Sequence, residues 1–239
     1  MGLLSLLIFL PLAATFLILL LPRSLQSSFK YIALFFTVLQ LLLSGYMYTQ
    51  FDGSATGINQ VSGYRFVEQL PWIHLDIGSL GRLEIDYFIG VDGVSLPLLV
   101  LSSLVMLMAV GSSWNIQKSP KGYFALLMLL NMAVMGIFAA LDFFLFYIFY
   151  EVMLFPLYFL IGIWGGANRE YAAIKFFIYT LFGSVFMLLV IVGLYFSVIN
   201  PDTGAHTFNM LHMMNPNNYV EGSFFAYLDN SHTIWGIPA

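Results

Sequence analysis

The sequence predicts an all-α, polytopic membrane protein with six transmembrane helices. Of its 239 residues, 60% are hydrophobic and only 8% are charged, and the mean hydropathy is +0.89. Soluble domains carry about 25% charged residues, so this composition indicates a chain that lies mostly within a bilayer. The apolar residues also gather into runs close to the roughly 20 residues that an α-helix needs to cross the hydrocarbon core.

The first two helices are expected over residues 3–21 and 31–48. Pro22 and Arg23 end the first apolar run, and the second run begins after Lys30. The first run has no basic segment before it and no small-residue cleavage site after it. It is therefore interpreted as a retained helix and not as a signal peptide.

Residues 51–86 differ in composition from the helices on either side. They contain glycine, serine, asparagine and glutamine, together with most of the ionisable groups of the first half of the chain. This segment is expected to form a loop outside the membrane. Residues 64–68 and 82–88 are candidates for two short paired strands, because residues 83–87 alternate apolar and acidic side chains.

The third helix is expected over residues 89–112. Asp92 or Ser95 can accept hydrogen bonds from the free N–H groups at its start. Pro97 then falls in the first turn, where the missing N–H of proline costs nothing. Asp92 is therefore assigned a structural role.

Three further helices are expected over residues 123–140, 143–164 and 172–199, joined by short polar turns. Residues 200–233 are polar and are expected to form a loop. The domain organisation that follows is 1–122 for the first three helices with loop 51–86, 123–199 for helices four to six, and 200–239 for the last loop and the end of the sequence.

Lysine and arginine in short loops predict the orientation, because such residues accumulate on the cytoplasmic side of a membrane. Three short turns hold most of these residues. They are Arg23 and Lys30, Lys118 and Lys121, and Arg169, with Lys175 just beyond. These turns are expected to be cytoplasmic, so the N-terminus and residues 200–233 are expected to be extracytoplasmic.

Glu151 is the main candidate for a functional residue. Apart from this glutamate, nothing between Asp142 and Arg169 is ionised at neutral pH. Asp142 is a good N-cap for the fifth helix, and a rise of 1.5 Å per residue puts Glu151 about 13 Å further along, near the middle of the membrane. A central charged residue costs roughly 2.5–3.5 kcal/mol on insertion scales, and such residues often belong to ion or proton paths.

The alternative interpretation of Glu151 is a protonated side chain that makes a static hydrogen bond between helices. Tyr147, Tyr150 and Tyr158 are plausible partners. Pro156 lies one turn beyond Glu151 and predicts a kink there, because proline cannot donate a backbone hydrogen bond and clashes with the carbonyl one turn back. The kink would free a carbonyl near Glu151, where water could bind.

Lys175 is the second candidate, and two interpretations stay open. It lies about one turn inside the membrane, so it is either a lysine that snorkels to the interface or a proton relay and electrostatic partner. A direct salt bridge with Glu151 is not expected. In a hairpin of helices five and six, Glu151 comes level with about Val185, roughly 15 Å in depth from Lys175.

Several classes of site are excluded by composition. The sequence has no cysteine, which excludes disulfides, cysteine-ligated iron–sulfur clusters and c-type haem attachment. The histidines have no metal-ligand spacing, and no phosphate-binding or dinucleotide-binding glycine motif is present. The sequence has no basic tract, so nothing in it suggests a nucleic-acid partner. We therefore expect no cofactor and no metal on this chain, with any redox chemistry on another subunit.

Three segments resemble the M subunits of bacterial NADH–quinone oxidoreductase, the chain-4 homologues of respiratory complex I. The segments are Gly90-Val-Asp-Gly-Val-Ser-Leu-Pro97, Phe149-Tyr-Glu-Val-Met-Leu-Phe-Pro-Leu-Tyr-Phe-Leu-Ile-Gly-Ile-Trp-Gly-Gly166 and Tyr171-Ala-Ala-Ile-Lys-Phe-Phe-Ile-Tyr179. Their order and spacing fit across residues 1–200, and the second segment is the most specific of the three.

The resemblance implies a proton-translocating, antiporter-like subunit of about fourteen helices with inverted repeats. Glu151 would be a key carboxylate of its half-channel and would pair with a lysine on a seventh helix, and Lys175 also stands at a lysine position of the family. The sequence stops before that helix, so it is expected to be a fragment or one part of a split subunit.

The same resemblance implies the surroundings of the chain. The location would be the bacterial plasma membrane, and the partners would be other membrane-arm subunits, especially the L-type and N-type antiporter-like ones. NADH, FMN, iron–sulfur clusters and quinone would bind to other subunits, so the chain would be part of a translocase without a redox site of its own. Two alternatives remain: a subunit of a cation/proton antiporter or membrane-bound hydrogenase, and a scaffold in which Glu151 is structural.

Overall fold

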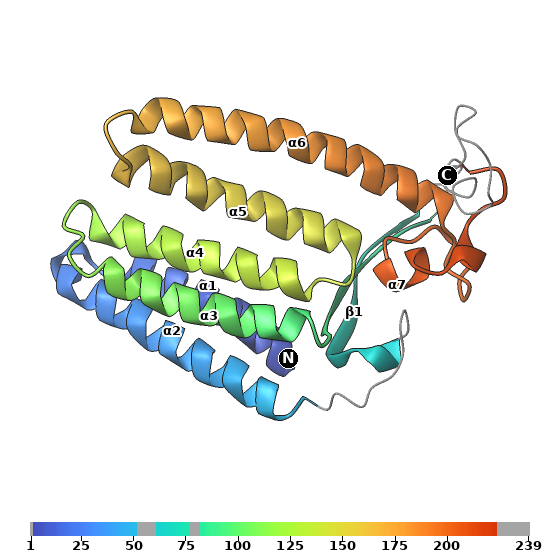
Figure 1. Cartoon of the computed structure of the whole chain (residues 1–239), viewed down its shortest axis with the longest axis horizontal. Coiled ribbons are helices and arrows are strands. Elements are labelled where there is room, and N and C mark those ends of the chain that lie inside the picture. Colours follow the sequence, from blue (N-terminus) through green and yellow to red (C-terminus); the bar gives the residue numbers. More distant parts are fainter. Residues whose placement is uncertain (1, 52–60, 77–81, 224–239) are drawn as a thin grey trace.

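The computed structural model describes residues 2–51, 61–76 and 82–223. Six helices in these ranges are long and apolar enough to cross a membrane. They run side by side, alternately in opposite directions, and the two strands lie at one end of the bundle (Figure 1). The helices are α1 Leu3–Leu20, α2 Gln26–Thr49, α3 Ser95–Ser112, α4 Pro120–Ala139, α5 Phe143–Trp164 and α6 Arg169–Ser197. The chain is thus a multi-pass membrane protein, as predicted.

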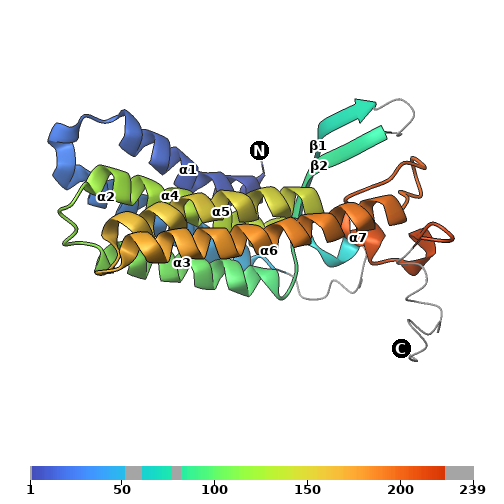
Figure 2. The ribbon, with the colours of Figure 1, turned by 90° about the horizontal axis from the view of Figure 1, so that it is seen from above.

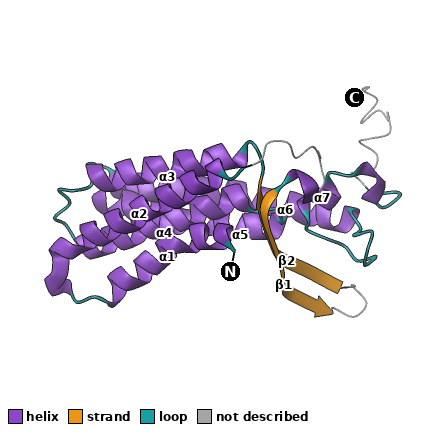
Figure 3. Cartoon of the chain, turned by 90° about the horizontal axis from the view of Figure 1, so that it is seen from below, coloured by secondary structure: helices purple, strands orange, loops and turns teal. Residues whose placement is uncertain are grey.

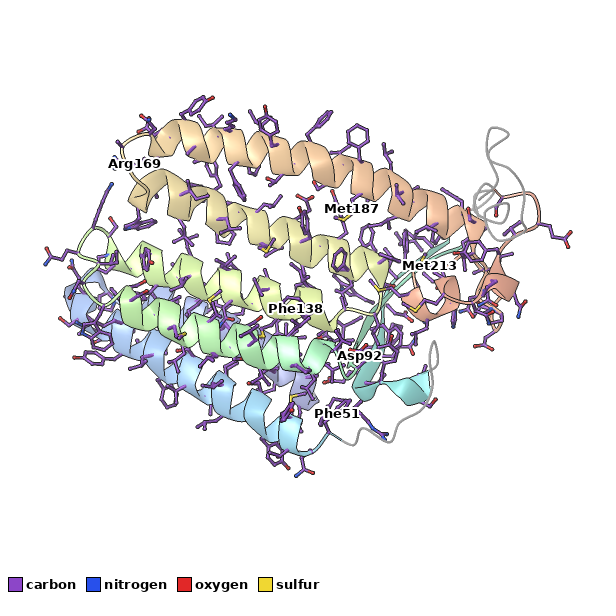
Figure 4. All side chains as sticks on the ribbon, viewed as in Figure 1. Phe51, Asp92, Phe138, Arg169, Met187 and Met213 are labelled. Atoms are coloured by element: carbon purple, nitrogen blue, oxygen red, sulfur yellow. The ribbon has the colours of Figure 1, made fainter. Side chains whose placement is uncertain are left out.

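Helix α4 lies at the centre of the bundle and packs against α1, α3 and α5. Its buried side chains contribute to both large apolar clusters, one around Met135 and the other around Met128. Helix α6, by contrast, packs mainly against α5. Figure 4 shows side chains projecting outward along the whole length of α6. Helices α1 to α4 therefore pack closely around one another, whereas α5 and α6 form a side of the bundle on which α6 has few contacts with other helices.

The third helix begins later than predicted, at Ser95 and not at residue 89. Residues 89–91 end a strand instead, because their backbone pairs with the neighbouring strand. The N-cap position of α3 is Val94, which makes no capping hydrogen bond with its side chain. Just before it, Asp92 Oδ1 accepts hydrogen bonds from the N–H groups of Val94 and Ser95, at 3.1 and 2.7 Å. Ser95 Oγ in turn accepts a hydrogen bond from the Asp92 N–H at 2.9 Å. These contacts join the end of β2 to the first turn of α3.

The two predicted strands are present and are longer than expected. Strand β1 covers Arg65–Asp76, strand β2 covers Arg82–Val91, and they pair antiparallel. The hairpin projects away from the helices (Figures 2 and 3). After α6, the described chain continues through the short helix α7, Met210–Met213, to residue 223 at the same end of the bundle. The rest of loop 51–86 and of region 200–239 lies outside the described residues.

A carboxylate on the hairpin caps the first helix from a distance. Glu68 accepts hydrogen bonds from the N–H groups of Gly2 and Ser5, at 2.8 and 2.9 Å, and from Ser5 Oγ at 2.7 Å. Ser5 Oγ also lies 2.8 Å from the Tyr87 hydroxyl on β2. The first turn of a helix has free N–H groups, and here a strand more than sixty residues away supplies their acceptor. Glu68 therefore fixes the hairpin to the start of α1.

We expect this contact to weaken in acid. Burial raises the pKa of Glu68, but the hydrogen bonds from Ser5 and Gly2 lower it more, so the pKa lies below the ordinary value of 4.5. A depressed folded pKa means that the stabilisation is present above pH 4.5 and is lost as the pH falls through the folded pKa. Loss of a cap costs about 1 kcal/mol. Protection of the amides in the first turn of α1, measured relative to their intrinsic exchange rates, should decrease there in the wild type, and Glu68→Gln should remove this pH dependence of the protection.

The turn between α4 and α5 is held on both sides by main-chain hydrogen bonds. We call residues 140–142 the corner. The Leu141 N–H donates to the Phe88 carbonyl of β2, and the Leu141 carbonyl accepts from the Met210 N–H, both at 2.9 Å. The corner is thus a third strand-like segment between β2 and the chain that follows α6.

The opposite end of the bundle is held by side chains. Lys118 Nζ donates to the Ile163 carbonyl at 2.9 Å, and Trp164 Nε1 donates to the Lys118 carbonyl at 2.7 Å. Lys121 Nζ donates to the Leu21 carbonyl at 2.7 Å. Both lysines therefore satisfy free carbonyls at helix C-termini, where a positive charge is also favoured by the helix dipole.

Candidate functional site

Helix α5 places Glu151 near the middle of its span. Asp142 Oδ1 accepts hydrogen bonds from the N–H groups of Phe144 and Leu145, at 2.9 and 3.0 Å, so the predicted N-cap is confirmed. The helix has 22 residues, and Glu151 comes about 13 Å after Asp142 along a length of about 33 Å. Pro156 is buried one turn further on, and α5 continues through it to Trp164.

The carboxyl group of Glu151 is only partly satisfied. Its Oε1 atom is buried and has no hydrogen-bond partner among the described residues. The Tyr147 side chain, one turn earlier on α5, interacts both with the Glu151 carboxyl and with the Ser184 hydroxyl of α6. Ser184 is 2% exposed. The three side chains thus form a small polar group between α5 and α6, with one carboxylate oxygen left open.

Of the three tyrosines expected near Glu151, Tyr147 is the one that contacts it. Tyr150 stacks on Phe146, with ring centroids 6.5 Å apart, and Tyr158 packs against Phe177 of α6 at 5.4 Å. Ser184 was missed in the sequence analysis, although the hairpin estimate pointed one residue away from it. A small polar residue at the depth of a buried carboxyl was the available signal.

Lys175 and Glu151 are not brought together. The pairing of Tyr158 with Phe177 and of Tyr147 with Ser184 fixes the register of α5 against α6, which leaves Lys175 roughly two turns from the level of Glu151. Lys175 lies on the exposed face of α6, with Nζ 5.7 and 5.8 Å from the ring centroids of Tyr171 and Tyr179. Those tyrosines are 69% and 70% exposed, so this face points away from α5.

Asp142 carries a second buried carboxyl, which the sequence analysis treated only as a cap. It is 2% exposed and lines a cavity of about 200 Å³ with Glu84, Asp86, Asp202 and His212. The pKa of Asp142 is raised to about 6, chiefly by burial and also by the nearby Asp86 carboxylate, although hydrogen bonds from Leu145, Phe144 and the Asp86 main chain oppose the rise. In the described parts of the chain, no group of His, Asp and Glu side chains could hold a metal ion.

We expect Asp142 to titrate near pH 6. Because its folded pKa lies above the ordinary 3.8, the folded state binds this proton more tightly, so the group adds stability as the pH falls from above 6 towards 3.8. Infrared difference spectra between pH 7 and 5 should show a carboxyl C=O band that is absent from Asp142→Asn, a variant that keeps the capping oxygen. A titration near 3.8 would contradict the assignment.

Comparison with known proteins shows what the chain is similar to. Residues 140–228 match the family described as NADH:quinone oxidoreductase/Mrp antiporter, transmembrane. Over 202 residues, or 83% of this chain and 38% of the relative, the sequence is 36% identical to NADH-quinone oxidoreductase subunit M of Rickettsia prowazekii. Over residues 140–228 the chain is thus similar to this family. The resemblance to M subunits is thereby confirmed, and the matched region contains α5, α6 and Glu151.

Relatives in the family serve more than one kind of complex. The sequence is 37% identical to F(420)H(2) dehydrogenase subunit M of Methanosarcina mazei, over 78% of this chain and 36% of the relative. Solved structures support the fold: a chain of respiratory complex I from Thermus thermophilus has a TM-score of 0.69 at 22% identity, covering 94% of this chain and 42% of that one. An archaeal membrane-bound sulfane sulfur reductase has a TM-score of 0.66 at 22% identity, covering 90% and 41%. The chain thus spans well under half the length of these relatives.

Proposed function

We propose that the chain is part of a proton-translocating, antiporter-like subunit in the membrane arm of an NADH–quinone oxidoreductase. In this proposal Glu151 takes up and releases the transported proton. The observation that carries it is a carboxyl group at the middle of a transmembrane helix with one buried oxygen that has no partner within residues 2–51, 61–76 and 82–223. A purely structural glutamate would be expected to satisfy both oxygens, because an unpaired polar atom in a low-dielectric interior is costly.

The hydroxyl groups beside Glu151 are suited to relay a proton. Tyr147 and Ser184 can each donate and accept a hydrogen bond, so they can orient the carboxyl and pass a proton towards α6. The open Oε1 atom provides a place for water or for a cation from the remainder of the subunit.

The finer assignments follow the same proposal. Redox chemistry would take place on other subunits, which hold NADH, FMN, iron–sulfur clusters and quinone, and L-type and N-type subunits would be neighbours. The chain would lie in a bacterial plasma membrane with the hairpin outside and the lysine-rich turns inside, following the lysine and arginine rule. Lys175 would act as an electrostatic partner on the outer face of α6, where a neighbouring subunit or a later segment would have to reach it.

A second candidate differs in the electron donor and not in the transport step. The similarity to an F(420)H(2) dehydrogenase subunit is as high as that to NADH-quinone oxidoreductase subunits, so an F420H2-oxidising complex is equally compatible with this chain. A subunit of a cation/proton antiporter or of a membrane-bound hydrogenase is a further alternative. Purification of the intact complex, followed by assay with NADH and with reduced F420, distinguishes the donors.

The test of the transport proposal is Glu151→Gln in the assembled complex, in sealed membrane vesicles. Acidification of the vesicle lumen should be lost. The amount of assembled complex should be measured in the same membranes, and a normal amount for the variant would show that the substitution does not impair folding or assembly.

A further inference from the structure

The lysine-rich end of the bundle contains a cavity whose lining residues have no role in the proposed proton transport. It consists of two adjoining hollows, of about 560 and 410 Å³, which share Gln26, Gln117 and Pro120. Helix α2 begins at Gln26 and α4 begins at Pro120, so the cavity lies between the ends of these two helices and the turn that joins α3 to α4. We call it the headgroup cavity.

The polar side chains of the headgroup cavity are cationic or neutral. Among the described residues, no aspartate or glutamate belongs to its lining, whose polar members include Gln26, Ser27, Lys30, Asn115, Gln117 and Lys121. Amide, hydroxyl and ammonium groups are all hydrogen-bond donors. The cavity therefore offers several donors and two positive charges without an anionic side chain among its lining residues.

The two lysines retain donors for a ligand. Lys30 Nζ lies 4.6 Å from the ring centroid of Trp114 and 5.6 Å from that of Tyr31, so aromatic faces hold the ammonium in place. Lys121 Nζ donates one hydrogen bond, to the Leu21 carbonyl. An ammonium has three N–H groups, and a cation–π contact uses the charge without using an acceptor. Both ammonium groups can thus still bind an anionic oxygen.

Apolar surface continues from the cavity along the bundle. On α2, Phe35 and Leu42 are 62% and 65% exposed, and on the adjacent α3, Val105 and Met108 are 52% and 62% exposed. Trp114 and Tyr31 pack edge to face at the border, with ring centroids 5.3 Å apart. Tryptophan and tyrosine are enriched where a membrane meets water. A donor-rich cavity above this surface matches a molecule with an anionic head and apolar tails.

We infer that the headgroup cavity binds the phosphodiester of an anionic phospholipid, whose acyl chains lie along α2 and α3. Basic pockets between transmembrane helices bind such headgroups because the charges attract and the phosphate oxygens accept hydrogen bonds. Lys30, Lys121 and Gln117 bind the phosphate, and the indole of Trp114 forms the side wall. This inference does not depend on the proposed function, since it concerns residues away from Glu151.

The test compares two lipids on the complete purified chain. The protein in zwitterionic detergent is incubated with equal amounts of phosphatidylglycerol and phosphatidylcholine, and the retained lipid is counted by native mass spectrometry. One basic residue near a membrane surface changes the binding of anionic lipid by about fivefold. We therefore expect at least about fivefold preference for phosphatidylglycerol, and Lys30→Gln should reduce its retention by about fivefold.

Two further variants make the result specific. Gln117→Glu places a negative charge in the cavity from an exposed loop position, so it should also reduce retention of phosphatidylglycerol while leaving the fold intact. Lys175→Gln is the matched control, since it removes a lysine at the same end of the bundle from a helix that does not line the cavity, and it should reduce the preference less than Lys30→Gln does.

Three outcomes would overturn the inference. The first is equal retention of the two lipids. The second is that the Lys30→Gln and Gln117→Glu proteins retain as much phosphatidylglycerol as the Lys175→Gln protein does. The third is displacement of phosphatidylglycerol by a large excess of inorganic phosphate, which would assign the cavity to a free anion, because the acyl chains would then contribute nothing.

Discussion

Glu151→Gln is expected to stop proton translocation almost completely. The amide has nearly the size and shape of the carboxyl group, so α5 should keep its packing, but an amide cannot release a proton at any accessible pH. Loss of a proton-transfer group typically costs about 10²- to 10⁴-fold in rate. We expect lumen acidification to fall by about 100-fold or more. NADH oxidation and acidification should be followed together in the same vesicles, so that slowed electron transfer is separated from lost coupling.

Two milder variants test the environment of Glu151. Tyr147→Phe and Ser184→Ala each remove a hydroxyl group from the polar group and keep the carboxyl. They should slow translocation less than Glu151→Gln does, because the carboxyl group that would carry the proton is kept. Normal acidification by the Glu151→Gln protein would reduce Glu151 to a structural residue, with similarity to the family as the remaining support for transport.

Gly136→Ala is expected to have the largest effect on stability. Gly136 lies on α4 against the ring of Phe149, and a Cβ atom at this position would overlap that ring. Phe149 is 6% exposed in the central cluster, two residues before Glu151, so the ring has little room to move. Overpacking of this kind costs roughly 1–3 kcal/mol. Thermal unfolding in detergent should show the loss, and proton translocation should fall as well, because α5 must shift away from α4.

Gly183→Ala is the matched control. Gly183 also lies within a helix, but a Cβ atom there meets nothing within 4 Å. Alanine favours helix over glycine by up to about 1 kcal/mol, so this variant should be neutral or more stable. Phe149→Leu in the Gly136→Ala background should recover part of the lost stability, since the smaller side chain leaves space for the new methyl group. Equal effects at Gly136 and Gly183 would contradict a packing explanation.

The helices were predictable because membrane thickness imposes a minimum length on an apolar run. The ends were less accurate: α2 and α6 extend over polar residues that the apolar criterion excluded, and α3 lost its first residues to strand pairing. The Asp142 cap was also predictable, because its partners are two and three residues away. The Glu68 cap was not, because Gly2 and Ser5 lie more than sixty residues from it, and nothing local in the sequence pairs them.

The sequence predicted how deep in the membrane each candidate residue lies, but not which face of its helix it occupies. Counting residues placed Glu151 at mid-span and separated it from Lys175, and both placements hold. The face of each helix depends on packing, which spacing alone does not determine when a helix is apolar all round. The exposed position of Lys175 and the contact of Ser184 with Tyr147 are therefore known only from the structure.

The two ends of α5 are held by different kinds of contact, so the helix can tilt about its first residues. Main-chain hydrogen bonds fix the corner at residues 140–142, whereas the far end is held by the Lys118 and Trp164 side chains. A tilt of α5 about the corner grows with distance along the helix. Glu151, about two fifths of the way along, would move about two fifths as far as Trp164. If the lysine-rich end of α5 moved by several ångströms, the Glu151 carboxyl group would thus move by about one or two ångströms. A movement of that size is enough to make or break a hydrogen bond.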